Sequence, residues 1–328
     1  MEEQKKLFDI IKTKIGEQQR LADVVEELLD IRQDSAYRRI RCATQLSFSQ
    51  LKILCERFNI SVDELFNRNS SNSALFKYSQ LVSDNRDDYA NYLKINSETL
   101  KTLLWSDPDS LLLAIAHDIP FYHFFKTPDL ALFRLFVWVD SLNHETGSFC
   151  KFSQNLDKNS IFSSYKRIYN TYLTTNSKEI WNVHTVDATL RLLNYYFGIG
   201  AFESKATALA LLENFKTLVD TIKQAADRGY TDEKKLAFFE MYITDVDLGN
   251  NMIIAKQQDK LLTIIRLYSI NRIFTDNQSL CFESEKWFNS LISKSILISG
   301  DAAFKERLLF FQKIEKKIKK MFKKIESL

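Results

Sequence analysis

Residues 18–66 read QQRLADVVEELLDIRQDSAYRRIRCATQLSFSQLKILCERFNISVDELF, and this stretch decides how the N-terminal part of the chain is organised. An apolar residue recurs at positions i, i+3, i+4 and i+7 in two places, first from Leu21 and again from Leu51. That spacing puts the apolar side chains on one face of an α-helix. The stretch therefore predicts two amphipathic helices with a shorter segment between them.

The short segment, residues 34–43, predicts a further helix with two different faces. Ala36, Tyr37, Ile40 and Ala43 lie on the side that can face the two flanking helices, with Tyr37 as the aromatic anchor. The opposite face carries Ser35, Arg38, Arg39 and Cys42. Arginine side chains hold phosphates and pair bidentately with guanine edges. A short anchored helix that presents adjacent arginines is therefore suited to the major groove of DNA.

The ends of these helices are also predicted by the sequence. S-F-S-Q at 47–50 and S-V-D-E at 61–64 are capping-box patterns, which begin helices. Asp34 is expected to cap the short arginine-bearing helix by accepting from its free N–H groups. An apolar stripe over residues 7–15 predicts a leading helix that ends near Gly16.

The whole pattern over residues 1–66 resembles the XRE-type, phage-repressor-like helix-turn-helix family. The run SAYRRIRCA at 35–43 stands where the recognition helix of that family stands. The run LSFSQLKILCERFNISVDELF at 46–66 is similar to the family's fourth and fifth helices. Two positions depart from the family pattern: Gln18-Gln19 replaces the usual Ser-Gln, and Cys42-Ala43 replaces the usual Gly after the recognition helix.

The resemblance implies a transcriptional regulator of the bacterial cytoplasm that binds double-stranded DNA through its third helix. The residues expected to bind DNA are Arg32, Gln33, Asp34, Ser35, Arg38, Arg39 and Arg41. Because acidic residues balance the basic ones within this module, one copy alone should bind weakly, so a homodimer on two half-sites is expected. The alternative is a helical scaffold whose N-terminal module docks a protein partner instead of DNA.

Length and composition predict two domains and a fold built almost entirely of helices. The chain has 328 residues, and a domain usually has about 100–200. Only seven Gly and three Pro are present, which favours long helices over a many-stranded sheet. The polar run NRNSSNS at 67–73 is the expected linker. We therefore expect an all-α protein, with a helix-turn-helix domain at 1–67 and an all-helical oligomerisation or effector domain at 74–328.

The second domain is expected to be a stack of helices. A helical stripe is predicted at 92–104, and Asp107-Pro108 is expected to start a helix whose buried run is 111–115. The further predicted helices are Leu130–Leu142, Ile161–Leu173, Val186–Phe197, Lys205–Ala226, Asp232–Ile243, Met252–Phe274 and Ser284–Ile298. No sustained repeat of about 34 residues is found, so an irregular helical domain is favoured over a repeat-like stack. An unknown small-molecule or protein effector is a possible ligand of this domain, on the basis of its size alone.

The end of the chain, residues 311–328, predicts a separate amphipathic helix. Its apolar residues alternate spacings of three and four, and lysines fill its other faces. Three interpretations remain open: packing on its own domain, pairing with a second subunit, or contact with anionic lipid or DNA.

Sequence motifs for catalysis are absent. The chain contains no G-x-x-x-x-G-K-[ST], no H-E-x-x-H and no G-x-S-x-G motif. His117 and His123 lie close in sequence, but on one helix they would point about 240° apart, and Pro120 would interrupt that helix. The four cysteines show no paired spacing, and no apolar run reaches the length of a membrane span. Neither an enzyme, a cofactor, a metal site nor a membrane partner is expected.

Overall fold

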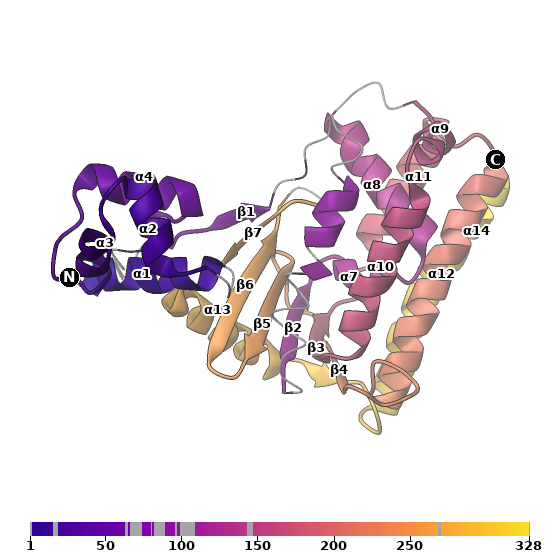
Figure 1. Ribbon diagram of the computed structural model, residues 1–328. Coiled ribbons are helices and arrows are strands. Elements are labelled where there is room, and N and C mark those ends of the chain that lie inside the picture. The colour runs from indigo at the N-terminus through magenta and orange to yellow at the C-terminus, as the bar shows by residue number, and fades with distance from the viewer. Residues whose placement is uncertain are drawn as a thin grey trace. The chain divides into compact units, whose positions relative to one another are not determined.

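The computed structural model describes residues 2–15, 19–62, 65, 74–79, 81, 89–95, 97–98, 109–142, 147–267 and 270–327. The chain forms two compact units, Met1–Leu75 (unit 1) and Phe76–Leu328 (unit 2) (Figure 1). The predicted linker at 67–73 lies outside the described residues. Of the predicted last helix of unit 1, at 61–66, three residues are described: Val62 and Leu65 are helical, and Ser61 precedes the helix.

Unit 1 is helical, as its apolar spacing predicts. Its described helices are α1 (Glu2–Lys14), α2 (Leu21–Leu29), α3 (Gln33–Ile40) and α4 (Phe48–Phe58). Their apolar stripes meet in one core, in which Leu7, Val25 and Leu54 are fully buried. The predicted first, second and fourth helices are therefore confirmed, and the third begins one residue earlier and ends three residues earlier than predicted.

The helix ends of unit 1 agree with one capping prediction and contradict another. Ser47 accepts from the backbone N–H of Gln50, and the Gln50 side chain accepts from the N–H of Ser47, so the capping box of α4 is confirmed. Asp34 is not the cap of α3. Arg32 occupies the N-cap position with extended backbone and no capping side-chain bond, and Asp34 lies inside the first turn. Its charge still favours the helix N-terminus electrostatically.

Unit 2 contradicts the all-α prediction, because it is built on a mixed eight-stranded sheet in the order β1-β7-β6-β5-β2-β3-β4-β8. The strands are β1 (Lys77–Ser79), β2 (Leu111–Ala116), β3 (Asn176–Trp181), β4 (Phe239–Ile243), β5 (Met252–Gln257), β6 (Lys260–Arg266), β7 (Arg272–Thr275) and β8 (Ile296–Leu297). The chain is therefore an α/β protein in unit 2 and not a helical stack.

The parallel half of the sheet consists of β2, β3 and β4, joined by helical crossovers. Strand β2 reads LLLAIA and is buried on both faces: Leu112 joins the large core on one side, and Leu113 joins the small core on the other. A strand buried on both faces is a continuous apolar run without alternation. Strand β4 similarly occupies the second half of residues 232–243, where a helix was wrongly predicted.

The antiparallel half occupies most of residues 252–274, where a single helix was wrongly predicted. Strands β5 and β6 form a hairpin, and β7 and β1 extend it. The two-residue turn of the hairpin is Gln258–Asp259, and Gln258 has a positive φ of 51°. Because neither turn residue is Gly, the usual sequence signal for a hairpin is missing here.

Helices cover both faces of this sheet (Figure 1). The helices are α7 (Phe121–Phe124), α8 (Pro128–Leu142), α9 (Phe149–Gln154), α10 (Lys158–Leu173), α11 (Asp187–Gly198), α12 (Lys205–Arg228), α13 (Gln278–Ile292) and α14 (Phe304–Ser327). Phe288 and Leu291 of α13 pack in the small core on one face, whereas the other helices build the large core. The helices predicted at 130–142, 161–173, 186–197 and 205–226 are confirmed as α8, α10, α11 and α12.

The terminal helix α14 packs on its own unit, along α12 and α11. Its apolar stripe is buried, including Phe311, Ile314 and Ile325. Lys317 on its flank donates to Asp187 Oδ1 of α11 at 2.6 Å. This arrangement agrees with the first of the three interpretations of residues 311–328. None of the helices in the described part of the chain has the length and apolarity needed to cross a lipid bilayer.

Candidate nucleic-acid interface and an internal cavity

Helix α3 is placed by a short turn and a small anchor. Three residues, from Asp30 to Arg32, connect α2 to α3, and Asp30 adopts the left-handed conformation with φ 49°. A connection of three or four residues is typical of a helix-turn-helix. Ala36 is fully buried against α1, α2 and α4, whereas Tyr37 is 39% exposed. The predicted inner face is therefore confirmed for Ala36 and for Ile40, which packs against the same core, and is wrong for Tyr37 and Ala43, which are exposed.

The seven predicted DNA-binding residues divide into two groups by exposure. Five of them are exposed: Arg32, Gln33, Asp34, Arg38 and Arg41. Ser35 and Arg39 are partly buried. All seven lie in one short segment and are therefore close together. Only five of them are exposed, so fewer residues than predicted are accessible to DNA.

Arg39 is bound within unit 1. Its Nε donates to Gln50 Oε1 at 3.1 Å, and its Nη1 donates to the carbonyl of Ser35 at 3.2 Å. Because Gln50 also belongs to the capping box of α4, Arg39 connects α3 to the start of α4. The Gln4 side chain donates to the carbonyl oxygens of Arg39 and Thr44, which ties α1 to the end of α3.

Arg41 and Cys42 shape the C-terminal end of α3. The guanidinium of Arg41 lies 5.8 Å from the centroid of the exposed Tyr37 ring, a cation–π distance. Cys42 has φ 59° and therefore takes the left-handed conformation that a glycine adopts most easily. It stands where the resembled family has Gly.

Chemically, the exposed face of α3 can hold anions. Arg32, Arg38 and Arg41 are exposed and accompanied on the helix by one carboxylate, Asp34. Guanidinium groups donate in a planar fork that matches phosphate oxygens and the O6 and N7 acceptors of guanine. Gln33 is positioned at the helix start by donating to Asp23 Oδ1 at 3.1 Å.

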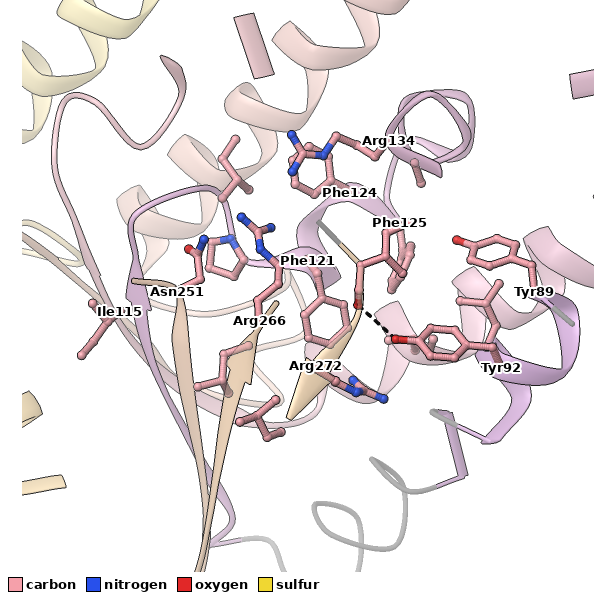
Figure 2. A pocket seen from close by; sticks show the side chains of 18 residues that line it. Tyr89, Tyr92, Ile115, Phe121, Phe124, Phe125, Arg134, Asn251, Arg266 and Arg272 are labelled. Carbon is pink, nitrogen blue, oxygen red and sulfur yellow. Dashed lines mark hydrogen bonds between the residues drawn. The ribbon is translucent and has the colours of Figure 1, made fainter. Parts of the chain in front are cut away.

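Unit 2 contains a cavity of about 100 Å³ at one edge of its sheet (Figure 2). This edge is formed by the carboxyl end of β2, the start of β5, the end of β6 and the start of β7. Aromatic side chains and isoleucines form most of the wall, and the polar residues Arg134, Asn251, Arg266 and Arg272 also line it. In α/β proteins, ligands bind preferentially beyond the carboxyl ends of the parallel strands.

A buried carboxylate, Asp118, joins two of these arginines. Its Oδ2 accepts from Arg134 Nη2 at 2.7 Å and from Arg266 Nη2 at 2.8 Å. Burial alone would raise the pKa of Asp118, but the two guanidinium groups outweigh burial and hold that pKa below its ordinary value. The side chain of Asn251 positions the segment that carries Asp118, because its Oδ1 accepts from the backbone N–H of Asp118 at 2.8 Å.

A second polar network lies deeper, around Glu179 of β3. This carboxylate accepts from Tyr122, from the indole N–H of Trp181, and from His123 at 3.0 Å. Burial alone would raise the pKa of Glu179, whereas His123 and these donors lower it below the ordinary value. The group is fully buried, so we interpret it as a structural element of the core.

Two signals in the sequence pointed toward these groups, although their chemistry was missed. Arg134 interrupts the most apolar helix of the chain, and a charge inside such a helix needs a partner. His117 and His123 lie close in sequence, with Asp118 between them, but the fold gives the three side chains different surroundings. Asp118 binds arginines, His123 binds Glu179, and His117 is exposed. Arg266 lies 148 residues further along the chain, and only the sheet topology brings it to Asp118.

Comparison of the chain with protein-family models, curated proteins and solved structures finds no match.

Proposed function

We propose that the protein is a sequence-specific DNA-binding regulator of transcription, in which α3 enters the major groove. The observation that carries this proposal is the exposed face of α3, with Arg32, Arg38 and Arg41 in solvent on a helix that Ala36 anchors. The three-residue turn from α2 and the resemblance of residues 1–66 to phage-repressor-like modules support it.

Within this proposal the residues have different roles. Arg38 lies in mid-helix and reaches base edges, while Arg32 and Arg41 at the two helix ends contact phosphates. Gln33 adds a hydrogen bond at the helix start. Arg39 is a positioning residue, because its guanidinium already bonds Gln50 and the Ser35 carbonyl. A homodimer that places two α3 helices on one duplex would compensate for the small contact of a single copy.

Fluorescence anisotropy with labelled duplexes tests the proposal. Duplexes selected from a random pool by the full-length protein are titrated with the wild type, with Arg38→Ala and with Arg57→Ala. Arg57 is an exposed arginine of α4 and serves as the matched control. We expect Arg38→Ala to weaken binding to the selected duplex by about ten-fold or more, in line with about 1–3 kcal/mol for a bidentate base contact. Equal binding by both variants and the wild type contradicts the proposal.

A protein-docking role for unit 1 is the second candidate, and one observation favours it. Phe48 at the start of α4 is 80% exposed, and Ile53 on the same helix is also exposed. Exposed aromatic and aliphatic side chains anchor protein interfaces. In this case Phe48→Ser would abolish partner binding, whereas Arg38→Ala would leave it unchanged.

A further inference from the structure

The charges around Asp118 do not balance. Two guanidinium groups, from Arg134 and Arg266, share a single oxygen of one buried carboxylate. This set of three groups therefore carries one net positive charge. A buried charge is costly unless an opposite charge pairs with it.

One nitrogen of Arg134 lacks such a partner. Arg134 is only 8% exposed and lines the cavity, and its Nη1 atom has no hydrogen-bond acceptor among the described residues. The Cζ atom of its guanidinium lies 5.1 Å from the centroid of the Phe124 ring (Figure 2), and an aromatic ring is no substitute for a hydrogen-bond acceptor at Nη1. Buried donors without a partner are rare, because the lost hydrogen bond to water is not replaced.

The remainder of the cavity favours an apolar body. Phe121, Phe124 and Phe125 of the α7 segment form one wall, and Ile253 and Ile264 of the hairpin form another. None of the described residues that line the cavity is an Asp or a Glu. An anion therefore meets the guanidinium groups of Arg134 and Arg266, while most of the remaining wall is apolar and Arg272 lies further along it (Figure 2).

We propose that this cavity binds a small organic acid, whose carboxylate pairs with Arg134 and Arg266 and whose apolar body lies among the phenylalanines and isoleucines. The volume of about 100 Å³ limits that body to a short branched chain, since a cavity that holds a benzene molecule has about 150 Å³. Inorganic phosphate would leave the apolar walls unused, and a neutral hydrocarbon would leave Nη1 of Arg134 unpaired. The proposal is independent of the proposed function of unit 1.

Isothermal titration calorimetry on the full-length protein tests the ligand class. The probes are 2-methylpropanoate and 3-methylbutanoate, each compared with its own neutral amide, and inorganic phosphate. We expect at least one acid to bind at least ten-fold more tightly than its amide and than phosphate. The proposal is overturned if neither acid binds, if amides bind as tightly as acids, or if phosphate binds as tightly as the acids.

Three variants test the place of binding. Arg266→Gln removes the excess positive charge and should weaken acid binding at least ten-fold. Ala131→Leu places extra carbon atoms into the cavity from α8 and should weaken acids and amides alike. Arg191→Gln changes an exposed arginine of α11 and should leave binding unchanged. Circular dichroism checks that each variant is folded. Unchanged acid binding in folded Ala131→Leu overturns the assignment to this cavity, even if Arg266→Gln fails to fold.

Discussion

At the residue scale, Arg38 and Arg39 show how neighbours on one short helix differ in role. Arg38 is exposed, whereas Arg39 is partly buried and bonds Gln50 and the Ser35 carbonyl. Their position on the polar face of α3 follows from the spacing of the sequence. Their difference in burial depends on the position of Gln50 at the start of α4, and the spacing of residues within α3 does not predict that position.

The capping box of α4 gives a prediction about local stability. Ser47→Ala removes the side chain that accepts from the N–H of Gln50, so α4 should lose about 1 kcal/mol of stability. Hydrogen exchange of the amides in residues 48–58 of the full-length protein should become about five-fold faster. The neighbouring Ser49→Ala is the control and should change exchange little. Equal exchange in the two variants would show that the capping box does not stabilise α4.

Glu179 gives a prediction about pH. Its pKa in the folded protein lies below the ordinary value of 4.5. Its ionised form therefore stabilises unit 2 above that pH, and this stabilisation is lost as the pH falls through the lower folded-state pKa. Glu179→Gln should lower the free energy of unfolding at pH 7 by about 3 kcal/mol, because it breaks a buried pair with His123. The difference from the wild type should shrink as the solution is made more acidic than pH 4.5.

Urea unfolding followed by tryptophan fluorescence measures this effect, because all four tryptophans lie in unit 2. Glu283→Gln, at an exposed position of α13, is the matched control and should change stability by less than about 0.5 kcal/mol at either pH. A deficit in Glu179→Gln that is the same at pH 7 and at pH 3 would contradict the role assigned to the ionised carboxylate.

At the element scale, the sequence predicts the helices far better than the strands. Helices at the surface of a core carry an apolar stripe of period 3.6, which is visible in α2, α4, α10 and α12. Strand β2 is buried on both faces and has no alternation to reveal it. Its run of leucines and isoleucine resembles a buried helix when it is considered alone. The scarcity of Gly and Pro also favoured the wrong all-α prediction, because several turns in this protein use other residues.

The β5–β6 turn gives a prediction at this scale. Gln258 has φ 51° and Asp259 has a negative φ, the sign pattern expected of a type II′ turn, in which Gly is preferred at the first position. Gln258→Gly should stabilise unit 2 by about 0.5–1 kcal/mol, because it relieves left-handed strain. Asp259→Gly is the control and should not stabilise. Thermal unfolding followed by tryptophan fluorescence checks this, and a lower melting temperature in Gln258→Gly would contradict the turn assignment.

At the scale of the whole molecule, the two units offer two kinds of binding surface. Unit 1 presents arginines on an exposed helix, and unit 2 encloses arginines in a cavity at its sheet edge. The first could be predicted from a contiguous stretch of sequence. The second could not, because Asp118, Arg134 and Arg266 come from a loop, a helix and a strand far apart in the chain. Only the order of strands brings them together.

The proposal that α3 enters the major groove is tested most directly by dimethyl sulfate footprinting, which methylates guanine N7 in that groove. In duplexes selected from a random pool by the full-length protein, bound protein should protect guanines from methylation. Arg38→Ala should restore methylation at a guanine within each half-site. Arg57→Ala should leave the protection pattern of the wild type unchanged. Failure to select any sequence, or selected duplexes whose guanines are methylated equally with and without protein, would contradict the account.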